Sequence, residues 1–332
     1  STSETGLGAA GGYFTLDRWK MLEAAASAGR FTMAQVADGP AGIANCLKLT
    51  TTTADTSIAA GEYLILQTKF EGQDLQQLKK GTASAEQVTV SFYVKGNAAA
   101  LYVCELFDYD NSRSITQSFA VTTAWNRIEL TFAADTSDPL DDDNAASLAI
   151  DIWLHAGATY TGGTFAVNTW NDNTDANRYA VADRTSIFDA TSRTLSITGV
   201  QMEIGTQATD FESRSYGEEL TLCQRYCYVV EGASKPIATS LSYAATASNG
   251  VVPFPVPMRT SPSATYAGGT DFLVTNGAGS ALTTTSVGNY VSSPVAIEFT
   301  TTVSGGGLTQ GQAGLQRTKD GNTAKITLYA EL

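Results

Sequence analysis

The chain has 332 residues, a length that corresponds to about two domains of ordinary size. Hydrophobic residues make up 43% and charged residues only 16%, so the chain can bury a core, and general disorder is excluded. The formal net charge of −13 argues against nucleic acid as the main partner. Residues 1–216 hold 26 acidic and 14 basic side chains, whereas residues 217–332 hold 7 and 6, which indicates two regions with different surfaces.

Strand-like segments dominate the first two thirds of the chain. Residues 1–12 are small and polar and predict a flexible lead-in. At 87–95, Val88, Val90 and Phe92 alternate with polar residues, a period of two that is typical of a strand. We expect further strands at 46–51, 62–70, 99–107, 127–132, 147–154 and 195–204. Many short strands separated by turn residues predict a jelly-roll β-sandwich over 13–214.

Helical patterns are rare. A short one covers 73–80, and a second covers 218–229, where two glutamates in the first turn suit the helix dipole. More strands are expected at 237–244, 251–257, 263–266, 295–302 and 323–330. The prediction is therefore an all-β chain, with a helix and linker at 215–235 and a small C-terminal β-sandwich domain at 236–332.

Four cysteines, Cys46, Cys104, Cys223 and Cys227, are too few and too scattered for a disulfide framework. No apolar run approaches the roughly 20 residues of a membrane-spanning helix. The first residues also lack the basic and apolar parts of a signal peptide. We therefore expect assembly in a reducing cytoplasm, without membrane insertion.

Few residues suggest catalysis. The single histidine, His155, is interpreted as a strand-end side chain with a local partner. Asp151 is expected to face away from the core, and the sequence links no second acid to it. No phosphate-binding loop, dinucleotide fingerprint or nucleophile elbow is present. We expect neither enzymatic activity nor an organic cofactor.

Carboxylates cluster in the run DPLDDDN at 138–144. Asp138, Asp141 and Asp143 are candidate ligands of a structural calcium ion, because Ca²⁺ prefers hard oxygen donors. The run lacks EF-hand spacing, and consecutive acids point in different directions. A solvated loop is the favoured interpretation.

Aromatic rings and polar side chains are mixed in the segment 160–179. Rings with flanking amides and carboxylates are a common way to hold a sugar, by apolar contact and hydrogen bonds. The candidate carbohydrate-binding residues are Tyr160, Trp170, Asn171, Asp172 and Tyr179. The alternative, which is the more common arrangement, is a long loop whose rings pack back on the sandwich or against a neighbouring subunit.

Several motifs occur in a characteristic order along the chain. They are GYFTLDRWK at 12–20, VTVSFYVKG at 88–96, TTAWNRIELTF at 122–132, ITGVQMEIG at 197–205, ATDFESR at 208–214 and LCQRY at 222–226. In this order they resemble a family of tailed-bacteriophage fibre or appendage proteins, virion structural proteins with a carbohydrate-binding-module-like jelly roll. The resemblance covers about residues 12–228, and LCQRY is its most specific part.

The resemblance implies a non-catalytic tail-fibre or appendage subunit, a homotrimer that contacts other virion proteins and binds a host-surface glycan. Its location would be the virion, after assembly in the host cytoplasm. Within the motifs, Trp19, Trp125 and Phe211 are interpreted as anchors of the sandwich. The alternative is a capsid decoration, cement or head-fibre protein. A polysaccharide depolymerase is a third hypothesis, which the lack of a visible acid pair disfavours.

Overall fold

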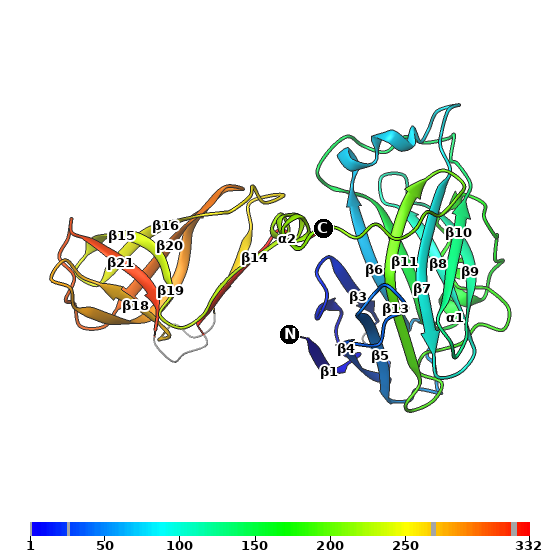
Figure 1. Cartoon of the computed structure of the whole chain (residues 1–332), viewed down its shortest axis with the longest axis horizontal. Helices are drawn as coiled ribbons and strands as arrows, with labels where there is room; N and C mark the ends of the chain where they lie inside the picture. Colours follow the sequence, from blue (N-terminus) through cyan, green and yellow to red (C-terminus); the bar gives the residue numbers. More distant parts are fainter. Residues whose placement is uncertain (1, 25–26, 267–269, 320–323) are drawn as a thin grey trace. The chain divides into compact units, whose positions relative to one another are not determined.

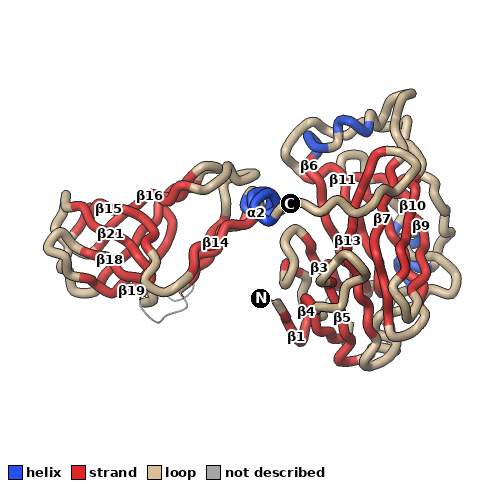
Figure 2. Tube along the Cα trace, in the orientation of Figure 1, coloured by secondary structure: helices blue, strands red, loops and turns tan. Residues whose placement is uncertain are grey.

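The computed structural model describes residues 2–24, 27–266, 270–319 and 324–332. The chain divides into two compact units, Ser1–Ser213 with Leu332, and Arg214–Glu331. Strands dominate both units, and helix is confined to short segments (Figure 2). The prediction of an all-β chain is confirmed. No helix in the described part of the chain is long and apolar enough to cross a membrane.

The first unit is a sandwich of two antiparallel sheets (Figure 1). The six-stranded sheet has the order β1 (Ser3–Leu7), β4 (Arg30–Val36), β5 (Cys46–Thr53), β13 (Thr194–Ile204), β7 (Val88–Gly96) and β10 (Asn126–Phe132). The seven-stranded sheet has the order β12 (Asn171–Asp172), β9 (Arg113–Val121), β8 (Ala100–Asp108), β11 (Ala146–Ala156), β6 (Tyr63–Glu71), β3 (Trp19–Glu23) and β2 (Gly12–Tyr13).

Both sheets contribute side chains to one apolar core. Phe92 on β7 and Leu49 on β5 belong to the same buried cluster as Ile152 on β11. The alternation at 88–94 therefore has the expected cause, because one face of β7 covers this core. Short helical segments connect the strands: η1 (Gly72–Asp74), η2 (Gln76–Leu78), α1 (Ala158–Thr161) and η3 (Asp175–Asn177).

The three predicted anchors differ in their surroundings. Trp19 on β3 is half-buried and packs against the core. Trp125 lies outside that cluster, where its indole N–H donates to the carbonyl of Asp38 at 3.1 Å. Phe211 lies outside any strand and is 38% exposed. Trp19 therefore meets the description of an anchor, Trp125 ties a loop to the sandwich surface, and Phe211 is not a core residue.

The second unit begins with α2 (Tyr216–Gln224), which Ser215 and Glu218 cap reciprocally. The predicted helix at 218–229 is therefore wrong beyond Gln224. Cys227 begins β14 (Cys227–Glu231), which pairs with β22 (Lys325–Tyr329), and β22 also pairs with β17 (Ser263–Tyr266). Pairing with a partner strand nearly a hundred residues away outweighs the local helical spacing.

The other strands of this unit close into a barrel. Their order is β15 (Pro236–Ala244), β16 (Ala247–Pro253), β20 (Ala296–Val303), β19 (Ala281–Ser292), β18 (Phe272–Thr275) and β21 (Ala313–Thr318). We expected a small sandwich, and the structure instead has this closed barrel and a separate three-stranded sheet. The buried Gln316 amide crosses the barrel and donates to the carbonyls of Ser248 and Phe299 at 3.0 and 3.2 Å.

Candidate functional site

The predicted sugar-binding side chains do not form one platform. Tyr179 is 1% exposed, and its ring stacks on that of Trp153 with centroids 6.1 Å apart. Its hydroxyl donates to the carbonyl of Thr185 at 2.7 Å. Tyr179 as a sugar contact is therefore wrong, because both its ring and its hydroxyl are used inside the fold.

The remaining candidates lie in different environments. The ring of Tyr160 contacts Tyr63 edge-on, with centroids 5.3 Å apart, and packs on Trp153. Trp170 instead donates its indole N–H to the carbonyl of Ala133 at 2.8 Å. Asn171 and Asp172 are exposed in β12, at the edge of the seven-stranded sheet. Within this segment, the rings pack back on the sandwich, as the alternative interpretation proposed.

The acidic loop does not gather its carboxylates. The Asp138 carboxylate lies 3.4 Å from Arg113 Nη1, and that of Asp143 accepts the backbone N–H of Ala145 at 2.8 Å. Asp141 uses its own backbone N–H to donate to Asp110. Within the described ranges, no group of three or more His, Cys, Asp or Glu side chains is arranged to hold a metal ion. Calcium binding at Asp138, Asp141 and Asp143 stays a prediction, and the contacts of Asp138 and Asp143 agree with the favoured interpretation of a solvated loop.

A different set of polar residues crosses the middle of the seven-stranded sheet. The strand register places one residue from each of β3, β6, β11, β8 and β9 in a single row: Lys20, Gln67, Asp151, Glu105 and Thr116. Their sequence neighbours, such as Leu66, Ile152 and Cys104, belong to the core of the sandwich. Because side chains alternate along a strand, the row lies on the outer face of the sheet.

Hydrogen bonds connect the centre of this row into a network. Gln67 Nε2 donates to Asp151 Oδ1 at 2.7 Å and to the Tyr109 hydroxyl at 3.0 Å. Arg178 Nη2 donates to Glu105 Oε2 at 2.7 Å and to Asp151 Oδ2 at 3.3 Å. The indole N–H of Trp153 also donates to Glu105 Oε2, at 2.7 Å. Two carboxylates on adjacent strands are thus held by one guanidinium.

Burial determines the charge of this network. Glu105 and Asp151 are 0% and 1% exposed. Burial, with the neighbouring Glu105 carboxylate, raises the pKa of Asp151 to about 7, although Arg178 opposes the shift. Burial alone would lower the pKa of Arg178, but its ion pair with Glu105 raises it overall, so the guanidinium stays charged. Arg178 therefore supplies a permanent positive charge over a carboxylate pair that takes up a proton near neutral pH.

Aromatic rings surround the network on this face. The Arg178 guanidinium lies 4.7 Å from the ring centroid of Trp153 and 4.8 Å from that of Phe107. On one side, Tyr160 and Tyr179 cover Trp153. On the other, Phe107 and Tyr109 pack edge-to-face at 4.8 Å, and both are partly exposed. We call the partly exposed surface formed by Phe107, Tyr109, Lys69, Lys20 and Arg178 the outer-face patch.

Sequence reasoning identified only one member of this network. It placed Asp151 away from the core, which the structure confirms, but linked no second acid to it. Glu105 is that acid, and the signal was a charged residue inside the apolar strand ALYVCELFD. Arg178 gave no signal, because it comes from a loop 73 positions further along the chain.

Comparisons with known proteins give weak likenesses. No protein-family model and no curated protein sequence matches the chain. A family 11 carbohydrate-binding module from Clostridium thermocellum, in complex with a β-1,3-1,4-mixed-linked tetrasaccharide, is 13% identical with a TM-score of 0.31, over 63% of this chain and 99% of that one. The N-terminal cellulose-binding domain of β-1,4-glucanase C from Cellulomonas fimi is 13% identical with a TM-score of 0.29, over 57% and 90%.

A phage protein is also among the similar structures. The enzymatically active domain of tailspike protein 4 from bacteriophage CBA120 is 10% identical with a TM-score of 0.31, over 56% of this chain and 19% of that one. Identities and TM-scores this low say nothing about what the present chain binds. The outer-face patch must therefore be judged on its own chemistry.

Proposed function

We propose that this chain is a virion structural protein of a tailed phage, a fibre or appendage subunit, that binds a host-surface glycan at the outer-face patch. The single observation that supports glycan binding is the position of the partly exposed Phe107 and Tyr109 rings beside the cationic groups of Arg178 and Lys69. A sugar ring has apolar C–H faces and polar edges, so it needs both kinds of partner side by side.

Binding without catalysis is the activity we propose for this patch. Glycosidases place two carboxyl groups on either side of the bond to be cleaved, roughly 5–9.5 Å apart. Here Glu105 and Asp151 are paired residues of neighbouring strands, buried, and joined by Arg178. A glycosidic bond has no room between them, so the pair serves to hold Arg178 and Gln67 in place.

The virion assignment rests on the ordered motifs between residues 12 and 228. It includes contacts with other virion proteins and a homotrimeric state, which we propose on the same resemblance. Immunogold labelling of particles with an antibody to this chain tests it. Label on the tail or its appendages supports the proposal, whereas label on the head alone favours a decoration protein, and unlabelled particles contradict both.

A glycan array tests the outer-face patch. We expect the full chain to bind a subset of bacterial surface glycans, and Tyr109→Ala to reduce that binding at least tenfold. Tyr243→Ala is the matched control, because Tyr243 is a 49% exposed tyrosine of the barrel unit. Asn171→Ala probes the 160–179 segment, the candidate glycan site of the sequence analysis. Equal binding by the wild type and Tyr109→Ala would exclude the patch, and loss with Asn171→Ala alone would restore the 160–179 segment.

A further inference from the structure

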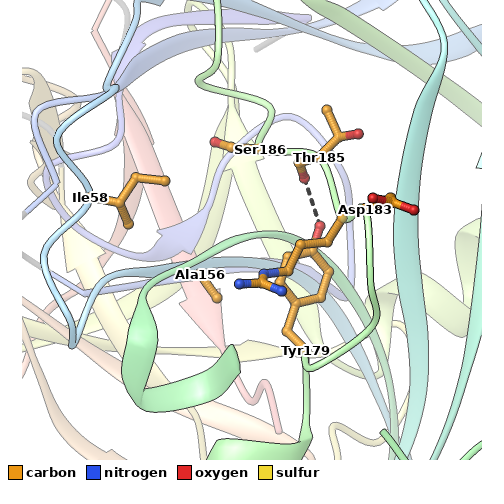
Figure 3. Close-up of a pocket in the computed structure, with 7 residues that line it drawn as sticks. Ile58, Ala156, Tyr179, Asp183, Thr185 and Ser186 are labelled. Atoms are coloured by element: carbon orange, nitrogen blue, oxygen red, sulfur yellow. Dashed lines mark hydrogen bonds between the residues drawn. The ribbon is translucent and has the colours of Figure 1, made fainter. Parts of the chain in front are cut away.

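A cavity of about 370 Å³ lies at the end of β11, in the seven-stranded sheet. Residues from three segments line it: Ile58, Ala156 at the end of β11, and the loop that carries Tyr179, Arg184 and Ser186. Figure 3 shows these walls, with the Tyr179 hydroxyl bonded to Thr185. The volume falls within the range of small-molecule sites, about 300–1,000 Å³.

A chain of hydrogen-bonded side chains, the Ser186–His155–Glu62 relay, leads from this cavity into the buried interior. Ser186 Oγ lies 2.7 Å from His155 Nδ1, and His155 Nε2 lies 3.3 Å from Glu62 Oε2. His155 is 0% exposed and Glu62 is 2% exposed, whereas Ser186 is partly exposed and lines the cavity. The relay therefore reaches the cavity through a hydroxyl group.

The partners of His155 define its tautomer. A carboxylate accepts hydrogen bonds, so Glu62 favours the proton on Nε2 and leaves the Nδ1 lone pair facing the Ser186 hydroxyl. Burial lowers the pKa of His155, although Glu62 and Asp55 oppose the shift, so the imidazole is neutral at pH 7. The Asp55 carboxylate accepts hydrogen bonds from the hydroxyl of Ser27 and from the backbone N–H groups of Ala28 and Ser57.

We propose that Ser186, His155 and Glu62 form a nucleophile–base–orienter set that hydrolyses small carboxylic esters held in this cavity. This is the arrangement that activates a serine, since the base is within hydrogen-bond reach of the nucleophile and is itself oriented by a third group. The proposal is independent of glycan binding at the outer-face patch. It adds an activity that the sequence-based interpretation of His155 as a strand-end side chain did not include.

The reaction balances with water as the only co-reactant. Ser186 Oγ attacks the ester carbonyl carbon while its proton passes to His155 Nδ1. The C–O bond to the alcohol then breaks, and the alcohol leaves with that proton. Water attacks the acyl-serine, gives its proton to His155, and the carboxylic acid departs as Ser186 recovers its proton. Arg184 lines the same cavity, and we assign its positive charge to stabilisation of the oxyanion.

Hydrolysis of p-nitrophenyl acetate by the full chain tests the proposal. We expect turnover above the buffer rate, and a loss of about 100-fold or more in Ser186→Ala. Ser57→Ala is the matched control, since Ser57 is an exposed serine of a neighbouring loop. The rate should hold constant from pH 8 to below 6.5 and then fall, because the pKa of His155 is lowered. Circular dichroism confirms that each variant is folded.

A second measurement does not depend on ester turnover. A fluorophosphonate probe should label Ser186 of the wild-type chain, as mapped by mass spectrometry of its peptides. Glu62→Gln, which retains the side-chain shape, should slow labelling about tenfold or more. Equal hydrolysis by the wild type and Ser186→Ala, or a probe that labels other serines as fast as Ser186, would overturn the proposal and leave the relay a structural hydrogen-bond chain.

Discussion

Arg178 makes two kinds of contact at one point on the outer face. Its guanidinium stacks on Trp153 and Phe107 while it donates to Glu105 and Asp151. Arginine suits this position because its flat, delocalised cation packs on rings and still presents a fork of donors. The loop that carries Arg178 is thereby fixed to β8 and β11, which positions the partly exposed rings of the outer-face patch.

Removing the charge of Arg178 is expected to destabilise the sandwich. Arg178→Met keeps much of the packing but leaves the buried carboxylates without their cation, at a cost of about 3–5 kcal/mol in the free energy of unfolding. Urea unfolding at pH 8 measures it. Glu86→Gln is the control, since it removes only the exposed ion pair with Lys79 and should cost less than about 1 kcal/mol. Similar small losses in both variants would contradict this account.

Asp151 is expected to make stability depend on pH. Its folded-state pKa, about 7, exceeds the unfolded value of about 3.9, so the folded state holds the proton more tightly. Its contribution is therefore fully present below pH 4 and is lost as the pH rises to 7, by at most about 1.4 kcal/mol per unit. Urea unfolding of the wild type and Asp151→Asn at pH 5, 6, 7 and 8 measures the difference. Parallel pH profiles would show that Asp151 does not titrate in this way.

Single residues were predicted from the sequence only where strand alternation sets their direction. Asp151 lies between Ile150 and Ile152, so its outward orientation follows from the period of two. Its partners Glu105, Gln67 and Arg178 come from other elements, and their meeting depends on register that alternation does not define. Tyr179 was misassigned because a loop tyrosine gives no local sign that its ring enters the fold.

The turn that follows β11 is held by close backbone packing. A methyl group on Gly157 would overlap the carbonyl oxygens of Ala59 and Ala60, whereas a methyl on Gly61 would meet no atom within 4 Å. Neither glycine has a positive φ, so the two positions differ in the space available for a side chain and not in backbone conformation. The segment that bears Ile58 is therefore pressed against the end of β11, next to His155.

The two glycines form a matched pair of substitutions. Gly157→Ala should lower the free energy of unfolding by about 1–3 kcal/mol, since the neighbouring backbone must shift to admit the methyl group. Gly61→Ala should change it by less than about 1 kcal/mol, through reduced freedom of the unfolded chain. Thermal unfolding followed by circular dichroism measures both. Equal effects would mean that the turn relaxes without cost.

Elements were predictable where local pattern and tertiary pairing agree. The strands expected at 87–95 and 147–154 correspond to β7 and β11, which are buried along most of their length. β9 was not predicted, because Gln117 interrupts the apolar alternation of Ile115, Phe119 and Val121 in its sequence RSITQSFAV. At 218–229 the local spacing was helical throughout. The last residues of this segment instead form the start of β14, because β14 pairs with β22.

The two units have separate cores. The sandwich buries Phe92 against Phe119, with centroids 5.0 Å apart, whereas the barrel unit buries Phe299 between Tyr266 and Phe272. The division at Ser213 and Arg214 falls where the charge distribution of the sequence changes. Barrel closure was beyond the sequence pattern, because the same strands form a barrel or a sandwich according to which edges pair. The pairing of β15 with β21, the first and last strands in the order, closes the barrel.

Separate cores predict two unfolding transitions in calorimetry of the full chain. Phe92→Ala should cost the sandwich about 3–5 kcal/mol and lower its transition by roughly 10 °C, since a domain of about 200 residues loses some 2–4 °C per kcal/mol. Phe299→Ala should move the other transition instead. A single transition that both variants shift equally would mean that the units unfold as one body. Two transitions that respond one to each variant would allow the outer-face patch and the Ser186 cavity, both in the sandwich, to be tested in Phe299→Ala without loss of their own unit.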